Sequence, residues 1–127
     1  MNETLHVGLD VGSTTVKIIV MDKNKNTLYK NYQRHFSDTK NTVCKVLEDL
    51  LIKYPLNSFT LALTGSGAMS AAKFLGVDFI QEVVSCKRAV EKYIPKTDVV
   101  IELGGEDAKI IYFDQSIEPV SYTHLTL

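Results

Sequence analysis

The residues best suited to chemistry lie together in the segment LDVGSTTVK, residues 9–17. The segment links two short apolar runs, so an acid, a glycine and three hydroxyl residues stand at one bend between two strands. Backbone N–H groups at such a glycine turn form a concavity that binds anions, because no Cβ blocks the approach. The pattern predicts a site for nucleotide phosphates built from Asp10, Gly12, Ser13, Thr14, Thr15 and Lys17.

The side chains around this bend supply what a phosphate site needs. The hydroxyl groups of Ser13, Thr14 and Thr15 can donate hydrogen bonds, and Lys17 can reach a phosphate oxygen. Magnesium prefers one or two carboxylates and keeps much of its hydration shell. Asp10 is therefore the predicted Mg²⁺ ligand, held through the ion's waters, and a predicted catalytic residue.

A second glycine bend, in IELGGEDAKI (residues 101–110), echoes the first. Both segments run apolar strand, acid, glycine corner, lysine and apolar strand, which indicates two structural repeats. Gly104 and Gly105 would admit phosphates, while Glu102 and Asp107 would position metal or the attacking water. Two such corners facing one cleft can clamp a triphosphate. The alternative is that both are ordinary hairpins with turn-favouring residues.

The composition is that of ordinary soluble globular protein. The 127 residues are 45% hydrophobic and 23% charged, with mean hydropathy +0.01 and net charge −1. No basic stripe favours nucleic acid, and no apolar run approaches the roughly 20 residues that cross a bilayer. The N-terminus carries an acid and leads directly into a strand, unlike a signal peptide. These features indicate a cytoplasmic protein that binds neither nucleic acid nor membrane.

The first half of the chain predicts three strands and a helix. The strands are expected at about Leu5–Asp10, Thr15–Asp22 and Thr27–Phe36, with connections short enough to imply antiparallel pairing. The helix should begin after a cap at Ser37 or Asp38 and stop before a proline, Pro55. Its apolar face is predicted to consist of Val43, Val46, Leu47, Leu50, Leu51 and Tyr54.

The second half alternates strands and helices. FTLALT reads as a buried strand, GSGAMSAAKFLG as a glycine loop with a short helix, and EVVSCKRAVEKYIP as a third helix. The order β-β-β-α-β-α-β-α, followed by a hairpin, predicts an α/β fold with a ribonuclease-H-like mixed sheet. We expect one subdomain over residues 1–97 and the truncated start of a second, similar one over residues 98–120.

Three other features are better explained by structure than by chemistry. Gly65-Ser66-Gly67 is only a partial dinucleotide fingerprint and favours packing at the start of a helix. Arg34-His35 is expected in a solvated loop, and the three histidines lack the spacing of zinc ligands. Cys44 and Cys86 are expected to be buried free thiols.

The two glycine bends also carry a family resemblance, which covers about residues 3–118. GLDVGSTTVK resembles the first phosphate motif of the actin, sugar-kinase and heat-shock-chaperone ATPase superfamily. IELGGEDAKI resembles the second motif, in the form typical of 2-hydroxyacyl-CoA dehydratase activators and benzoyl-CoA reductase ATPase subunits, with Glu102 where many relatives have Asp. RHFSD and TGSGAMSAAKFLGVDFIQEVV are similar to the linking segments of the long dehydratase activases.

The resemblance implies an actin-like ATPase of anaerobic metabolism that binds ATP and Mg²⁺. Such activators are homodimers when full length and share one 4Fe–4S cluster. They use ATP hydrolysis to pass a low-potential electron from a ferredoxin- or flavodoxin-type donor to a 2-hydroxyacyl-CoA dehydratase-type component. The family's cluster cysteines lie downstream of the second bend, and neither Cys44 nor Cys86 matches them.

The chain is therefore expected to be an N-terminal fragment that is inactive by itself. Its last residues, SYTHLTL (121–127), are expected to be a non-native tail, with one more strand as the alternative. Two other functions stay open at this point. One is a sugar-type kinase of the same superfamily, and the other is a non-catalytic nucleotide-binding or interaction module.

Overall fold

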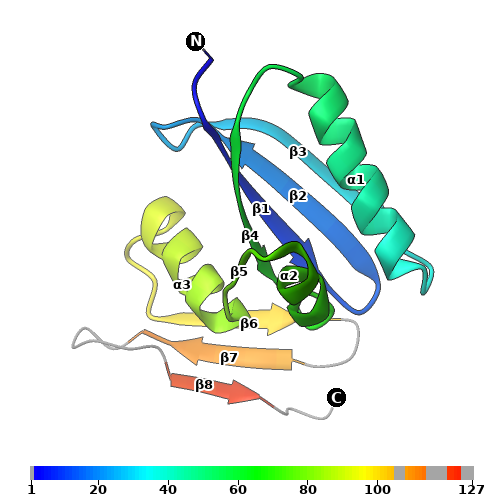
Figure 1. Cartoon of the computed structure of the whole chain (residues 1–127). Coiled ribbons are helices and arrows are strands. Elements are labelled where there is room, and N and C mark those ends of the chain that lie inside the picture. The colour runs from blue at the N-terminus through cyan, green and yellow to red at the C-terminus, as the bar shows by residue number, and fades with distance from the viewer. Residues whose placement is uncertain (1, 105–107, 114–119, 124–127) are drawn as a thin grey trace. The chain divides into compact units, whose positions relative to one another are not determined.

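The computed structural model describes residues 2–104, 108–113 and 120–123 (Figure 1). The chain divides into two compact units, residues 1–80 and residues 81–127. The second unit thus begins with the third helix of the chain, α3 (Glu82–Tyr93). The subdomain boundary that the sequence predicts after residue 97 stays a prediction. Within the described residues, no helix has both the length and the apolar character that crossing a membrane requires.

The first unit is built on a five-stranded mixed sheet in the order β3-β2-β1-β4-β5. The first three strands pair antiparallel, while β4 joins β1, and β5 joins β4, in parallel. Short turns can only reverse the chain, whereas the two parallel pairs are reached through helical crossovers. The strands are Leu5–Val11 (β1), Thr15–Met21 (β2), Thr27–Arg34 (β3), Phe59–Thr64 (β4) and Asp78–Phe79 (β5). The predicted ribonuclease-H-like mixed sheet is confirmed.

One face of this sheet forms the core of the first unit. Because side chains alternate along a strand, every second residue of β1 and β2 points to that face. Helix α1, Thr39–Lys53, lies along the sheet (Figure 1). It packs on this face through residues about one helical turn apart. The buried residues are Leu5, Val7, Leu9, Val11, Val16, Ile18, Val20, Val43, Val46 and Leu50. Each such side chain contributes about 1.5–3 kcal/mol through burial.

Helix α1 begins after Asp38, as predicted, but it differs from its prediction in its apolar face and in how its N-terminus is capped. Leu50 is 3% exposed, but the next residue, Leu51, is 56% exposed, so its assignment to the apolar face is wrong. Adjacent helical residues point about 100° apart, and the sheet covers only the Leu50 side. Asp38 is the N-cap residue, but its carboxylate accepts a hydrogen bond from the side-chain amide of Asn41 instead of a helix N–H. The helix ends at Lys53, before Pro55 as predicted.

Helix α2, Met69–Leu75, follows β4 and the glycine loop, and its Ala72 joins the core. It ends at Gly76, which adopts a left-handed conformation with φ +67°. The prediction of buried cysteines is wrong for Cys44, which is exposed on α1. Cys86, in α3, is half-buried.

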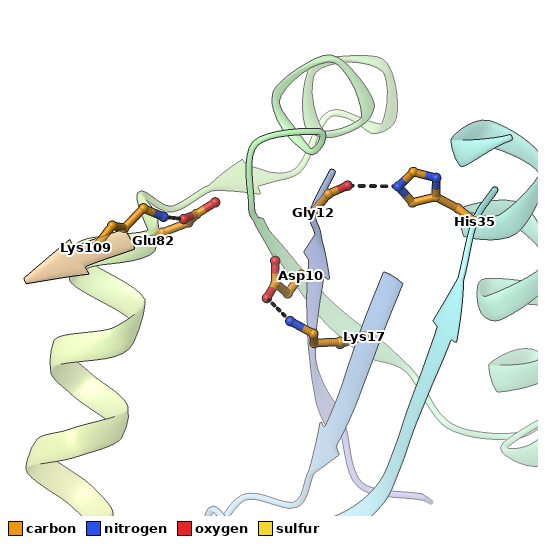
Figure 2. A network of polar contacts seen from close by, with 6 residues as sticks. All are labelled: Asp10, Gly12, Lys17, His35, Glu82 and Lys109. Carbon is orange, nitrogen blue, oxygen red and sulfur yellow. Dashed lines mark hydrogen bonds and ion pairs between the residues drawn. The ribbon is translucent and has the colours of Figure 1, made fainter. Parts of the chain in front are cut away.

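The second unit consists of α3, Glu82–Tyr93, and a three-stranded antiparallel sheet in the order β6-β7-β8. The strands are Val99–Leu103 (β6), Ala108–Tyr112 (β7) and Val120–Thr123 (β8). Lys109 of β7 forms an ion pair with Glu82 of α3 (Figure 2). The backbone of residues 121–123 thus forms part of a strand, and residues 124–127 lie outside the described residues. That residues 121–127 are non-native stays a prediction.

Candidate functional site

The turn between β1 and β2 carries the first group of predicted site residues. The N–H of Gly12 donates to the carbonyl of Thr15 over 2.9 Å and closes the turn. Ser13 and Thr14, at its tip, are exposed, whereas Thr15 is buried. Two of the three predicted hydroxyl donors are therefore open to a ligand. The phosphate role of all three stays a prediction.

Asp10 and Lys17 face each other across β1 and β2 immediately below this turn. They are Cα partners in the antiparallel register, which places their side chains on the same face of the sheet. The Lys17 ammonium nitrogen lies 3.4 Å from Oδ2 of Asp10 (Figure 2), and both side chains are partly exposed. Lys17 also lies 5.8 Å from the ring centre of Tyr32, its partner on β3. The sequence predicts both residues for the site, and the structure brings them together.

The glycine loop between β4 and α2 packs against the end of β1, beside Asp10. A Cβ on Gly65 would lie 2.3 Å from the carbonyl oxygen of Val11 and 2.6 Å from Oδ1 of Asp10. Gly65 also has φ +104°, a conformation that favours glycine. The N–H of Gly67 donates to the same Val11 carbonyl over 2.8 Å. The predicted packing role of this loop is confirmed, but its contact with the Asp10 carboxylate was not predicted.

A polar atom of β4 also lies in this part of the sheet without a partner. Thr64 is the Cα partner of Asp10 on the parallel strand β4, so the two side chains share a face. Its hydroxyl oxygen is buried and makes no hydrogen bond within the described parts of the chain. Thr64, Asp10 and Lys17 therefore form a polar row across three strands at the end where the glycine turn lies.

His35, the residue that follows β3, supports the turn, and the prediction of a solvated loop at this residue is wrong. Its side chain is only 5% exposed. The ring nitrogen Nε2 lies 3.0 Å from the carbonyl oxygen of Gly12 (Figure 2). Its backbone N–H donates to the carbonyl of Thr14, also over 3.0 Å. The sequence signal for this contact was the predicted β2–β3 pairing, because the bond between His35 and Thr14 lies one residue beyond the last strand partners, Thr15 and Arg34.

The second group of predicted site residues belongs to the second unit. Glu102 and Gly104 are exposed at the end of β6, and Lys109 is the strand partner of Glu102. Gly105 and Asp107 lie outside the described residues, so their predicted roles have no structural account. Burial raises the pKa of the Cys86 thiol on α3, and the negative charge of Glu102 raises this pKa further. The roles of Glu102, Gly104, Gly105 and Asp107 in phosphate and metal binding stay predictions.

The side chains around the first turn fit a magnesium ion better than they fit a metal cluster. Among residues 2–104, 108–113 and 120–123, no three His, Cys, Asp or Glu side chains are grouped so that they can hold a metal. Magnesium needs only one or two carboxylates because water fills its other positions, and Asp10 can supply one. An iron–sulfur cluster requires four thiolates. Cys44 is exposed on α1 and Cys86 is half-buried on α3, and neither belongs to a group of three metal-binding side chains among the described residues.

Solved structures share this fold. Component A of (R)-2-hydroxyglutaryl-CoA dehydratase from Acidaminococcus fermentans matches with TM-score 0.80 and 18% identity, over 95% of this chain and 47% of that one. The activator of 2-hydroxyisocaproyl-CoA dehydratase from Clostridium difficile, solved with bound ADPNP, matches with TM-score 0.74 and 24% identity, over 94% and 46%. The likeness shows that the chain belongs to the class of proteins with the actin-like ATPase fold.

The sequence defines the family within this class. The model of the BadF/BadG/BcrA/BcrD ATPase family matches residues 7–122, and the chain belongs to that family. The (R)-2-hydroxyglutaryl-CoA dehydratase activating ATPase of Acidaminococcus fermentans is 31% identical over 112 residues, which are 85% of this chain and 42% of that protein. The chain thus spans less than half the length of the curated relatives it matches.

Proposed function

We propose that this chain is the N-terminal part of a longer ATP-hydrolysing activator of a 2-hydroxyacyl-CoA dehydratase-type enzyme. The observation that carries the proposal is the open glycine turn at Ser13 and Thr14, with one carboxylate and one ammonium group beside it. Relatives named as dehydratase activators, one solved with a bound ATP analogue, support the same activity.

Four residues of the first unit would act on the nucleotide. Ser13 and Thr14 are exposed, and their N–H and hydroxyl groups would bind phosphate oxygens at the turn. Asp10 would hold the waters of a magnesium ion, which when bound supplies positive charge to the transferring phosphoryl group. The Lys17 ammonium is tied to Asp10 by a partly exposed ion pair, which is weak. It would exchange this partner for a phosphate oxygen when the nucleotide binds.

For the second bend, a role in phosphate and metal binding is supported by its sequence match alone. Gly104 and Gly105 would accept phosphates, and Glu102 or Asp107 would position metal or the attacking water. In the intact protein we further propose that hydrolysis drives transfer of a low-potential electron from a ferredoxin- or flavodoxin-type donor to the dehydratase component. The ligands of an iron–sulfur cluster, and with them the contact of a homodimer, would lie outside this chain.

The test compares two matched aspartate variants of the intact protein. Asp10→Asn keeps the size of the side chain but removes its charge, and we expect Mg²⁺-dependent ATP hydrolysis to fall on the order of 10²-fold. Asp49→Asn removes an exposed carboxylate from α1 and should leave hydrolysis unchanged. Calorimetry with Mg-ATP reports binding separately. Equal affinity and turnover in both variants would reject the role of Asp10, whereas a wild type that binds Mg-ATP without hydrolysing it would favour a non-catalytic module.

A second assay separates an activator from a kinase of similar fold. The intact protein is mixed with ATP, a reductant and a 2-hydroxyacyl-CoA dehydratase component, and dehydration is followed. Activation that requires both ATP and reductant supports the proposal. Transfer of the γ-phosphoryl group to a sugar or acid, without activation of the dehydratase, would indicate a small-molecule kinase instead.

A further inference from the structure

His35 is a buried side chain that contacts the backbone of the candidate phosphate turn from the connection between β3 and α1. We propose that His35 is a positioning residue, which holds the turn from Gly12 to Thr14 in the shape that receives phosphate. The inference rests on the phosphate role proposed above for this turn. It assigns no contact between His35 and the nucleotide, because the ring is buried and its contact is with the backbone of the turn.

The hydrogen-bond partners of the ring determine which nitrogen carries the proton. The backbone N–H of Ser37 donates to Nδ1 over 3.1 Å, so Nδ1 must be the unprotonated acceptor. The neutral ring then carries its hydrogen on Nε2, which donates to the carbonyl oxygen of Gly12. Ser37 therefore orients the ring, and the ring orients Gly12. We call this pair of hydrogen bonds, from Ser37 to the ring and from the ring to Gly12, the relay. It requires an acceptor at Nδ1 and a donor at Nε2.

The bond to Gly12 determines the direction of a backbone N–H at the tip of the turn. No peptide bond within the described part of the chain is cis. In a trans peptide the C=O and the following N–H point in opposite directions. Since the Gly12 carbonyl points toward the His35 ring, the Ser13 N–H points away from it. Backbone N–H groups with this kind of fixed orientation are the donors that anion-binding turns use.

A short strained segment behind the turn keeps His35 in place. Phe36 and Ser37 both have positive φ, +48° and +63°, which side chains larger than glycine rarely adopt. Such conformations persist where the surrounding contacts over-determine them. Here the N–H of Asp38 donates to the carbonyl of His35 over 2.8 Å, while Ser37 donates to its ring. These local hydrogen bonds fix the position of His35 before α1 begins.

Two substitutions at this position divide the relay into its halves. His35→Gln places an amide NH₂ near the position of Nε2, so it keeps the donor to Gly12 and loses the acceptor for Ser37. His35→Asn places an amide oxygen near the position of Nδ1, so it keeps the acceptor and loses the donor to Gly12. Both remove the ring, so both are expected to lower the melting temperature of the protein by a similar amount. His6→Asn, at an exposed position of β1, is the matched control.

The measurement is steady-state ATP hydrolysis by the intact protein, together with Mg-ATP affinity and melting temperature. We expect kcat/KM to fall about 10-fold or more in His35→Asn, since a small misplacement of binding groups is costly. His35→Gln should stay within about threefold of the wild type, and His6→Asn should equal the wild type. If His35 were merely structural, the Asn and Gln variants would have equal activity at equal melting temperature. A lower kcat/KM in His35→Asn alone is therefore evidence for positioning.

Two results would overturn the inference, and they are distinguishable from failure of the proposed function. Equal activity of the Asn and Gln variants, in a protein whose wild type hydrolyses ATP, rejects the positioning role alone. Activity that follows melting temperature across all variants does the same, because it leaves only a structural role. A wild-type protein that neither binds nor hydrolyses Mg-ATP rejects the proposed function, and the role of His35 falls with it.

Discussion

Lys17 and Asp10 are partners on antiparallel strands, and the ammonium nitrogen of Lys17 lies 3.4 Å from a carboxylate oxygen of Asp10. Both side chains are between one third and one half exposed, so water screens much of their attraction. A pair of this kind contributes about 0–1 kcal/mol to stability. The pair is therefore easily opened. The proposed function requires this, because Lys17 must move to a phosphate oxygen and Asp10 must turn toward a metal ion.

Removing the Lys17 ammonium should affect ligand binding far more than folding. Hydrogen bonds to charged groups contribute about 1.5–3 kcal/mol, so we expect Lys17→Met to weaken Mg-ATP binding by about 10-fold or more. The melting temperature should change little. Calorimetry and thermal unfolding of the same samples measure both quantities. Lys23→Met, at an exposed turn residue, is the control, and equal affinities in the two variants would exclude a phosphate contact by Lys17.

Two glycines with positive φ should differ in how badly they tolerate alanine. Gly76→Ala adds a Cβ into open space and is expected to cost about 1 kcal/mol for the left-handed backbone alone. Gly65→Ala has the same kind of backbone cost, and its Cβ also collides with the Val11 carbonyl and the Asp10 carboxylate. Its expected cost is about 3 kcal/mol or more. Urea unfolding of both variants gives the comparison, and equal costs would contradict the close packing at Gly65.

Neighbouring leucines of α1 provide a test of which helix face packs on the sheet. Leu50 is buried, and truncation to alanine there should cost about 2–5 kcal/mol because a cavity remains. Leu51 is mostly exposed, so Leu51→Ala should change stability by about 0.5 kcal/mol or less. Urea unfolding measures both. A large loss at Leu51 would mean that this side chain is covered in the intact protein.

The reactivity of Cys86 should report the charge of Glu102. Burial and this carboxylate both disfavour the thiolate, which raises the pKa of Cys86 above the usual value of about 8.5. Between the usual and the raised pKa, the protein therefore holds less thiolate than an ordinary cysteine, and alkylation is slow. Glu102→Gln removes the smaller of the two causes, so the pKa falls and alkylation at a fixed pH near 8.5 becomes faster.

Mass spectrometry of the peptide that contains Cys86 measures the rate of its iodoacetamide labelling in a Cys44→Ser background, where Cys86 is the remaining thiol of residues 1–127. The control, Glu91→Gln, removes a carboxylate of α3 that pairs with Lys87, and it should leave the alkylation rate nearly unchanged. A rate that stays the same or falls in Glu102→Gln would contradict an influence of Glu102 on this thiol.

Most of the fold was predictable because its signals are local. The alternation along β1 and β2 reveals which side chains are buried, and short polar turns require antiparallel neighbours. The helix face was less certain, because the 3.6-residue period identifies a stripe without its edges. Leu51 lies at such an edge, where only the outline of the sheet decides between burial and exposure.

The sequence by itself determined the glycine turn at Gly12 and the carboxylate of Asp10, since the residue types of a bend and its flanking strands are read directly from the chain. Only the tertiary structure decided that His35 holds this turn and that Gly65 touches Asp10. Both contacts join segments far apart in sequence, through the β2–β3 register in one case and the parallel β1–β4 pairing in the other. A local pattern cannot encode such partners, because strand register and crossover arise only when the whole sheet assembles.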